Sequence, residues 1–290
     1  MSKTTTSAKP LQNKIDFIAI VQANYCNPNG DPLCENRPRT DSNGFGIITD
    51  TCIKRKIRNR LQDAGYPIFV QMDERATDGY KSLADRAKGE IGNSKDKKAF
   101  LDKANEMYMD VRSFGQVFAF SGKNSVSINV TGPVSLHIAR SVAPVEIIDA
   151  QITKSVNNET SEKDPDKKAS DTMGMKHFIA HGLYVIKGAM NVQRAEKTGF
   201  SEDDANAILE ALRTLFVNDA TAARPDGSME VCKLYVWRHN CKDGQYPSAK
   251  IHNSLTIAPK DPDSLPKSIE DYDIVLTELP GITPEVLDGI

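Results

Sequence analysis

Paired cysteines and long apolar runs are missing from the sequence, and each absence excludes a class of protein. The five cysteines are odd in number and form no Cys-x-x-Cys pair, so neither a disulfide framework nor a paired zinc site is expected. No stretch approaches the roughly 20 apolar residues that a membrane helix needs, and MSKTTTSAKP has no apolar signal-peptide core. We therefore expect a soluble, cytoplasmic protein with reduced thiols and no membrane partner.

Catalytic and cofactor motifs are also missing. The sequence has no Gly-x-Ser-x-Gly elbow and no Gly-Lys-Ser/Thr of a phosphate-binding loop. His177 and His181 are four residues apart, but no adjacent glutamate or third ligand accompanies them, so we expect ordinary polar or packing roles. The sequence predicts no catalytic residue, no metal site and no cofactor.

A strong excess of one charge is absent as well, because the formal net charge is −2. This balance argues against nucleic acid binding by bulk electrostatics, but it leaves local basic patches open. The places where basic residues cluster therefore indicate where nucleic acid could bind.

Hydrophobic patterns predict a series of strands and helices. Residues 15–23 are apolar on both alternating faces, which is typical of an interior strand. Thr49 or Asp50 can cap a helix that runs to about Ala64, with isoleucines and leucine spaced four apart as its buried stripe. The other predicted elements are a strand over 111–120 joined by the turn SGKN to a strand over 125–138, extended segments over 144–156 and 174–192, a helix with a Ser201–Asp204 capping box, and a strand over 231–237.

Without its insertions, this order is the βαββαβ order of the ferredoxin-like fold, to which RNA recognition motifs belong, so the predicted class is α+β. We expect a flexible leader (1–13), one elaborated domain (14–258) and an acidic, proline-containing C-terminal extension (259–290) that is irregular. Inside the domain, the charge-balanced region 72–110 indicates a helical insertion. A hairpin over 143–182 projects from the domain, and its polar tip, 157–172, has almost nothing to bury.

The loop NPNGDP, residues 27–32, resembles the start of a calcium-binding loop. Asn27, Asn29 and Asp31 occupy its first, third and fifth places, but Pro32 replaces the required glycine and Pro38 stands where the bidentate glutamate belongs. We therefore expect a bend that delivers the next segment, with Asx turns at Asn and Asp.

That next segment is the main basic cluster of the chain. Arg37 and Arg39 lie in a long polar loop, and Lys54, Arg55, Lys56, Arg58 and Arg60 follow in the first turns of the predicted helix. Guanidinium groups and a helix N-terminus can converge on a phosphodiester. Two other interpretations stay open, namely a solvated helix face and a module that binds an acidic protein partner.

Several motifs in order resemble a known family. They are NPNGDP, NRPRTD, GFGIITD, CIKRKIRNRL, VRSFGQVFA, GPV, ITK and MGMKHFIAHGLYVIKG, which together span about Asn13 to about Asn240. This combination closely resembles the backbone subunit of type I CRISPR Cascade surveillance complexes, most like that of subtype I-C.

The resemblance implies a modified RNA recognition motif shaped as a hand, with a ferredoxin-like palm, helical fingers (72–110) and a thumb hairpin (143–182). It implies several copies stacked head to tail along one crRNA as a helical filament, which leaves bases exposed for pairing with target DNA. The other implied partners are the guide-processing cap subunit, the large subunit and the small subunit of Cascade. Family members of this type bind RNA and do not cut it, so we expect no enzyme.

The expected RNA contacts come from loop residues, from palm residues and from basic residues. The loop and palm residues shape the backbone or allow close approach, and the basic residues hold phosphates without reading sequence. The sheet lacks the aromatic RNP signature, so base stacking on its face is not expected. The candidate residues are Asn27, Asn29, Gly30, Asp31, Arg37, Arg39, Lys54, Arg55, Lys56, Arg58, Ser113, Phe114 and Gly115, with Lys154, Lys176 and His177 on the thumb.

A metal-dependent ribonuclease is the alternative function. Asp31 and Asp41 are two carboxylates in a polar loop, which is the kind of pair that can hold hydrated Mg²⁺. Turn formation and pairing with Arg37 or Arg39 are the competing roles for the same side chains.

Overall fold

The computed structural model describes residues 9–92, 96–119, 127–153 and 173–290 of the chain. The SGKN turn, Lys154, the predicted tip 157–172 and most of the predicted leader lie outside these residues. In the part that is described, every helix is too short or too polar to span a bilayer.

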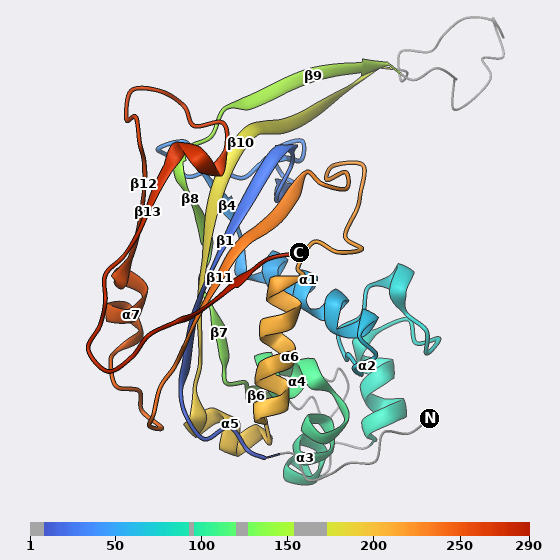
Figure 1. Ribbon diagram of the computed structural model, residues 1–290. Coiled ribbons are helices and arrows are strands. Elements are labelled where there is room, and N and C mark those ends of the chain that lie inside the picture. The colour runs from blue at the N-terminus through green and yellow to red at the C-terminus, as the bar shows by residue number, and fades with distance from the viewer. Residues whose placement is uncertain (1–8, 93–95, 120–126, 154–172) are drawn as a thin grey trace, which may run out of the picture.

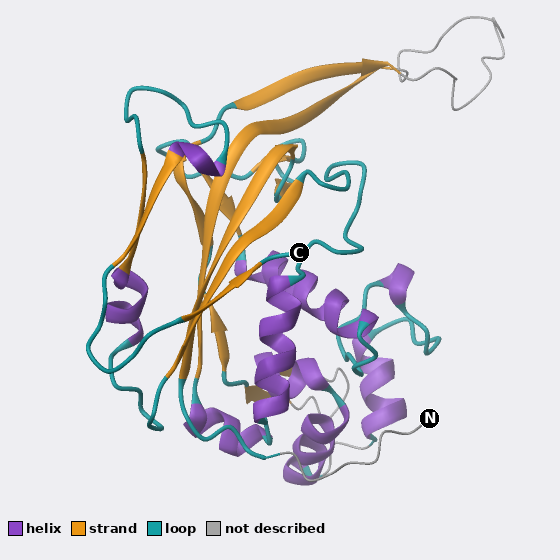
Figure 2. Cartoon of the chain, in the orientation of Figure 1, coloured by secondary structure: helices purple, strands orange, loops and turns teal. Residues whose placement is uncertain are grey.

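A mixed α+β architecture surrounds one large antiparallel sheet, as the predicted class requires (Figures 1 and 2). Among the described residues its order is β14-β11-β1-β10-β8-β4, with β7 and β9 also paired to β10. Its strands are β1 (Ile15–Cys26), β4 (Phe45–Ile48), β7 (Val134–Leu136), β8 (Ala139–Pro144), β9 (Ile147–Thr153), β10 (Met173–Met190), β11 (Met229–Arg238) and β14 (Glu285–Asp288). Three shorter pairs are β2 (Gly30–Asp31) with β3 (Arg37–Pro38), β5 (Gly115–Ala119) with β6 (Ser127–Thr131), and β12 (Leu255–Pro259) with β13 (Tyr272–Leu276).

Strand β1 is the centre of the sheet and is buried on both faces, as its alternation predicts. Phe17 and Val21 belong to the hydrophobic cluster on one face, and Ile18 and Ile20 belong to the cluster on the other. The first face is covered by α1 (Asp50–Asp63) and α6 (Glu202–Arg213), and the second by α7 (Ser248–Ser254) with β12 and β13 (Figure 1).

Both long helices on the first face begin where the sequence predicts. The side chain of Thr49 accepts a hydrogen bond from the amide of Cys52 and caps α1. Ser201 and Asp204 form a complete capping box at α6. These caps satisfy amides that have no partner inside the helix, so short local motifs were sufficient to predict them.

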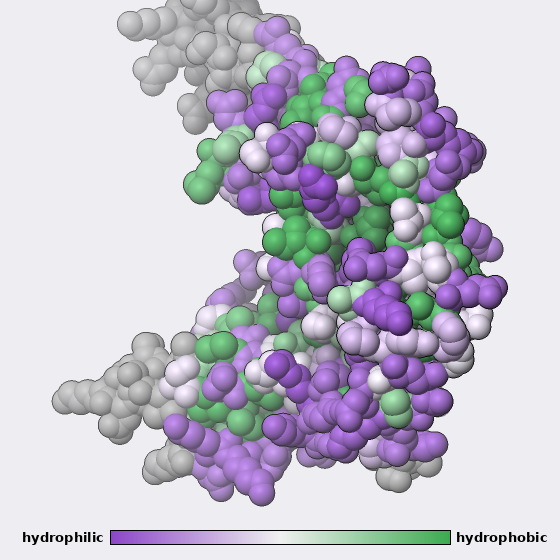
Figure 3. All heavy atoms as spheres, turned by 90° about the vertical axis from the view of Figure 1, so that its left-hand side faces the viewer, coloured by the Kyte–Doolittle hydropathy of each residue, from purple (hydrophilic) through white to green (hydrophobic). Residues whose placement is uncertain are grey.

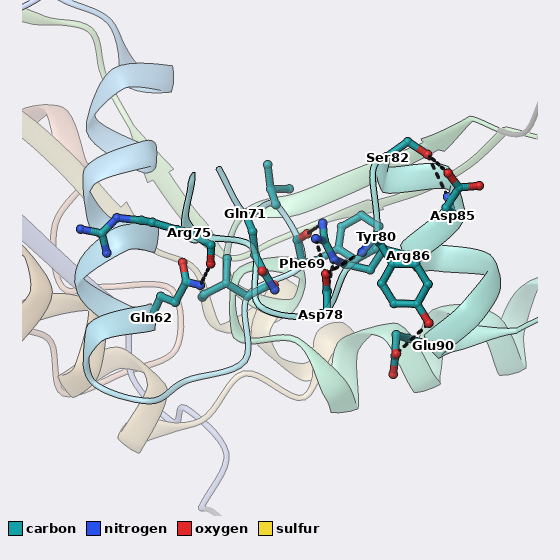
Figure 4. Close-up of polar contacts among 12 residues, drawn as sticks. Gln62, Phe69, Gln71, Arg75, Asp78, Tyr80, Ser82, Asp85, Arg86 and Glu90 are labelled. Atoms are coloured by element: carbon teal, nitrogen blue, oxygen red, sulfur yellow. Dashed lines mark hydrogen bonds and ion pairs between the residues drawn. The ribbon is translucent and has the colours of Figure 1, made fainter. Parts of the chain in front are cut away.

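The predicted insertion folds as short helices with a small core of its own. It contains α2 (Leu83–Arg86) and α3 (Lys97–Met107). Helix α4 (Met109–Phe114) begins at its end, and α5 (Val192–Thr198) packs beside α4. Arg86 fixes the loop before α2, because its guanidinium bonds both carboxylate oxygens of Asp78, at 2.5 and 2.9 Å, and the carbonyl oxygen of Phe69 at 2.9 Å. Figure 4 shows this cluster, together with the Tyr80–Glu90 hydrogen bond of 2.9 Å.

The predicted strand over 111–120 is wrong in its first half. Residues up to Phe114 belong to α4, and only Gly115–Ala119 form a strand, β5, which pairs with β6. Gly115 ends the helix with φ of +83°, and a Cβ there would lie 2.4 Å from the carbonyl oxygen of Val130. The switch from helix to strand thus depends on a glycine in the left-handed region.

The predicted irregular tail is also wrong. Residues 255–276 form the β12–β13 hairpin, and β14 adds a further strand beside β11. Tyr272 and Ile282 are buried against Ile18 and Trp237, whereas the acidic residues between them face outward. The tail therefore covers the second face of the sheet.

Candidate nucleic-acid interface

The loop after β1 is braced against the start of α1. The Asn29 Oδ1 atom accepts hydrogen bonds from the Thr49 amide at 3.0 Å and from its hydroxyl at 3.1 Å. Asn27 donates from Nδ2 to the carbonyl oxygen of Asn36 at 2.6 Å. Asn29 therefore ties the polar loop to a helix N-terminus, and Asn27 closes the loop on itself. A role in RNA binding for them stays a prediction.

Gly30 and Asp31 shape the same loop. A Cβ at Gly30 would lie 2.0 Å from Asn36 Oδ1 and 2.9 Å from the Asn36 carbonyl oxygen, so a larger residue would displace the Asn36 side chain. Asp31 accepts from the amide of Leu33 at 3.1 Å and pairs with Arg39 at 3.2 Å. The Asx turn and ion pair expected for this carboxylate are both present.

A row of four cations, which we name the edge strip, lies along the β4 edge of the sheet. Residues 37–41 run outside β4, since the amide of Ile47 donates to the carbonyl oxygen of Arg39 at 2.8 Å. Helix α1 follows β4 directly in the chain. Strand β8 is the neighbour of β4 in the sheet. The strip comprises Arg37, Arg39, Lys54 and Arg140.

Each cation of the edge strip is paired with its own aspartate. The pairs are Arg37–Asp149 at 3.0 Å, Arg39–Asp31 at 3.2 Å, Lys54–Asp50 at 3.0 Å and Arg140–Asp41 at 2.8 Å. All four cations keep part of their side chain exposed, between 25% and 50%. The strip is therefore accessible to an anion although its formal charge is balanced.

Arg37 connects the strip to the base of the projecting hairpin. Asp149 on β9 lies between Arg37 and His177 of β10, whose Nδ1 is 2.6 Å from the Asp149 carboxylate. Hydrogen bonds from His177 and Arg37 hold the pKa of Asp149 below its ordinary value. The His177 side chain is buried in this cluster, while Lys176 beside it is exposed.

Three basic residues of α1 make structural contacts instead of facing solvent. Lys56 is 4% exposed and pairs with Asp219, and Arg58 is 11% exposed and pairs with Asp110 at 2.9 Å. Arg55 donates to the carbonyl oxygen of Val70 at 2.7 Å, and burial lowers its pKa. The phosphate contacts predicted for these residues would require their bonds to break, and Lys56 and Arg58 are far less exposed than the cations of the edge strip.

The predicted palm residues Ser113, Phe114 and Gly115 have mainly structural contacts. The Ser113 hydroxyl is buried and donates to the carbonyl oxygen of Met109 at 2.6 Å. The Phe114 ring lies 5.1 Å from the guanidinium of Arg58. The close approach at Gly115 is to the backbone of β6, so its role near RNA stays a prediction.

Two hollows adjoin the edge strip. One, of about 440 Å³, is lined by Lys54, Phe114, Lys14 and Arg194, and by β7. The other, of about 560 Å³, lies between β8 and β12. Figure 3 views the molecule from the β12–β13 side and shows a concave outline with apolar residues at its inner edge.

Arg140 was not among the residues predicted to contact RNA. Its partner Asp41 is 99 positions away, and nothing in the local sequence indicates that the two meet. The alternation of HIARSV, in which Arg140 lies two residues from Ile138 and from Val142, was the signal that could have placed it on one face of a strand.

Asp41 and Asp31, the two carboxylates of the ribonuclease alternative, each serve a turn and an ion pair. Asp41 accepts from the amides of Asn43 and Phe45, at 2.9 and 3.0 Å, and from Arg140. The hydrogen bond from Arg140 is the main reason that the pKa of Asp41 is lowered. Within the described ranges, no group of three or more His, Cys, Asp or Glu side chains is placed to hold a metal ion.

Comparison with known proteins gives a family match over most of the chain. A family model described as "CRISPR-associated protein Cas7" matches residues 13–277. The Haloferax volcanii protein "CRISPR-associated protein Cas7" is 28% identical over 299 residues, covering 96% of this chain and 85% of its own. Of the solved structures, a chain of "CRISPR RNA-guided surveillance complex, pre-nicking" has 15% identity, a TM-score of 0.47 and coverage of 77% of this chain and 78% of its own. A chain of "CRISPR RNA-guided surveillance complex" has 18% identity, a TM-score of 0.43 and coverage of 77% and 68%.

Proposed function

The chain belongs to the Cas7 family of CRISPR-associated proteins, and from this premise we propose that it is a crRNA-binding backbone subunit of a type I Cascade complex. The motifs quoted above favour subtype I-C. The proposal includes a cytoplasmic location, head-to-tail stacking of several copies into a filament, and pairing of the exposed guide bases with target DNA. The cap, large and small subunits of the complex are its expected protein partners.

The topology supports the palm, fingers and thumb of this proposal. The order β11-β1-β10-β8, with α1 after β1 and α6 after β10, is the order of a ferredoxin-like βαββαβ unit. We assign that unit as an RNA-recognition-like palm, residues 72–110 as fingers and the hairpin within 143–182 as thumb. The domain 14–258 is extended at both ends, because Leu11, in the predicted flexible leader, is 1% exposed in the core and β14, in the predicted extension 259–290, is a strand of the main sheet.

The observation that carries the proposal is the edge strip. Its cations come from residues 37–39 outside β4, from β8 and from the second turn of α1, and each is partly exposed. Contacts to phosphates position an RNA strand without reading its sequence, which suits a protein that carries many guides.

We propose a binding role without catalysis. Asp31 and Asp41 have their oxygens engaged by amides and arginines, as a loop scaffold requires. Incubating labelled RNA with the protein and Mg²⁺, and then with a chelator, tests this directly. Chelator-sensitive cleavage that disappears in Asp31→Ala would favour the ribonuclease alternative.

RNA binding measured against salt tests the edge strip. The slope of log K against log salt changes by about 0.7 for each phosphate contact of a single strand. The double variant Arg37→Gln with Lys54→Gln removes two of the proposed contacts, so we expect its slope to be flatter by about 1.4. Titrations from about 50 to about 300 mM salt, followed by fluorescence anisotropy, cover the range that is needed.

The matched control lies at the opposite side of the sheet. Lys233 and Arg238 are on β11, and Lys233 is ion-paired with Asp288 much as Lys54 is with Asp50. Lys233→Gln with Arg238→Gln removes the same charge and should leave the slope unchanged. Equal slopes for the two double variants would mean that the edge strip does not hold RNA.

A further inference from the structure

Arg140 and Phe45 form a stacked pair at the β4 edge of the sheet. The guanidinium carbon of Arg140 lies 3.5 Å from the centroid of the Phe45 ring. Arg140 Nε donates to Asp41 Oδ2 at 2.8 Å, and Asp41 is itself held by the amides of Asn43 and Phe45. One face and one edge of the guanidinium are therefore fixed.

The contacts with Phe45 and Asp41 leave 50% of the Arg140 side chain exposed. Arg140 lines the hollow of about 560 Å³ between β8 and β12, and Phe45 does not line it. The Phe45 ring thus contacts the guanidinium from outside the hollow that Arg140 lines.

The walls of this hollow are partly apolar. Ile138 is 57% exposed and lines the same hollow, as do Val142 and Val185. Lys187 and Asn253 add polar groups to the wall. A flat ligand with apolar faces and polar edges matches these walls.

We propose that Arg140 stacks one nucleobase of the bound RNA strand in this hollow, with Phe45 as its support. The inference rests on the proposed function and adds a base contact to it. Guanidinium planes stack on unpaired RNA bases. Arg140 differs from the other cations of the edge strip because a ring backs its guanidinium and because it lines a hollow with apolar walls, so it suits a base better than a phosphate. The platform replaces the aromatic residues that an RNP signature would supply.

A thermodynamic cycle between the base and the arginine tests the proposal. The full chain, Arg140→Lys and Phe45→Leu are each titrated with an adenosine oligomer and with an abasic oligomer of the same length. We expect the wild-type preference for the adenosine oligomer to fall about fivefold or more in Arg140→Lys, because a lysine keeps the charge but has no plane. Phe45→Leu should lower the same preference, since the guanidinium loses its support.

Each outcome has one meaning. An adenosine preference that changes less than about twofold in Arg140→Lys overturns the base contact. So does a salt slope that is flatter by about 0.7 in Arg140→Ala with the adenosine preference intact, because Arg140 would then hold a phosphate. Arg238→Lys, on β11, is the matched control and should behave as wild type. A chain that binds neither oligomer would overturn the proposed function as well.

Discussion

Replacing Asp219 by Asn should have a large effect on stability. The Lys56 side chain is 4% exposed and that of Asp219 is 14%, and the ammonium bonds the carboxylate directly. The Asn variant leaves the ammonium buried beside a neutral amide and the Phe216 ring, which lies 5.2 Å away. Breaking a buried pair typically costs about 3–5 kcal/mol, and the partial exposure of Asp219 favours the lower end. A loss of about 3 kcal/mol should lower Tm by roughly 5 °C in a chain of 290 residues.

The pH dependence of this loss has a definite sign. Burial already lowers the pKa of Lys56 from its ordinary 10.5, and the charge of Asp219 opposes that shift. Without Asp219 the pKa of the folded state falls further, so the unfolded state binds the proton more tightly. The penalty is fully present below the folded-state pKa and is relieved as pH rises through it toward the unfolded value. The variant should therefore regain stability on the alkaline side of neutrality.

Urea unfolding at about pH 7 and about pH 9 measures both effects. Lys56→Met is the matched control, because it removes the charge but keeps an apolar stem, and Arg224 still lies 3.7 Å from Asp219. We expect a smaller loss in the control and an unchanged salt slope for RNA binding. A loss below about 1 kcal/mol in Asp219→Asn would refute the reasoning, since that is the range of an exposed pair.

Two further predictions concern the insertion and the switch from helix to strand that follows it. Gly115→Ala should cost roughly 1–3 kcal/mol in urea unfolding, because φ is +83° and its Cβ would lie 2.4 Å from the Val130 carbonyl oxygen; unchanged stability would contradict the clash. The hydrogen bonds from Arg86 hold the pKa of Asp78 below 3.8, so their contribution is present above that pH and is lost as pH falls through the folded value. Limited proteolysis of the insertion should accelerate below about pH 4, and Asp78→Asn should not show this added acceleration.

The parts of the fold that are set by local rules could be predicted from the sequence. The alternation of β1 and the caps at Thr49 and Ser201 depend on residues within a few positions of each other. The run over 111–120 misled the prediction, because its aromatic and β-branched residues favour a strand although packing places the first part in α4. The tail was mispredicted because its apolar residues are spread among acidic ones and meet only in the folded hairpin.

The candidate site was less predictable, because its chemistry depends on distant partners. The basic cluster of α1 was found, but the sequence did not indicate which of its cations are accessible. Lys56 is 163 positions from Asp219 and Arg58 is 52 from Asp110, and these contacts decide which cations are withdrawn from solvent. Lys54 stays partly exposed because its partner, Asp50, is only one turn away on the surface of α1.

The paired charges of the edge strip have a consequence for the speed of association. A row in which each cation has an aspartate within about 3 Å projects little field into solution, so a passing RNA is not drawn in from a distance. Encounter then proceeds near the slower rate of unsteered docking, and attraction develops only at contact. For the proposed crRNA, association would therefore be slow unless the strand is already close to this surface.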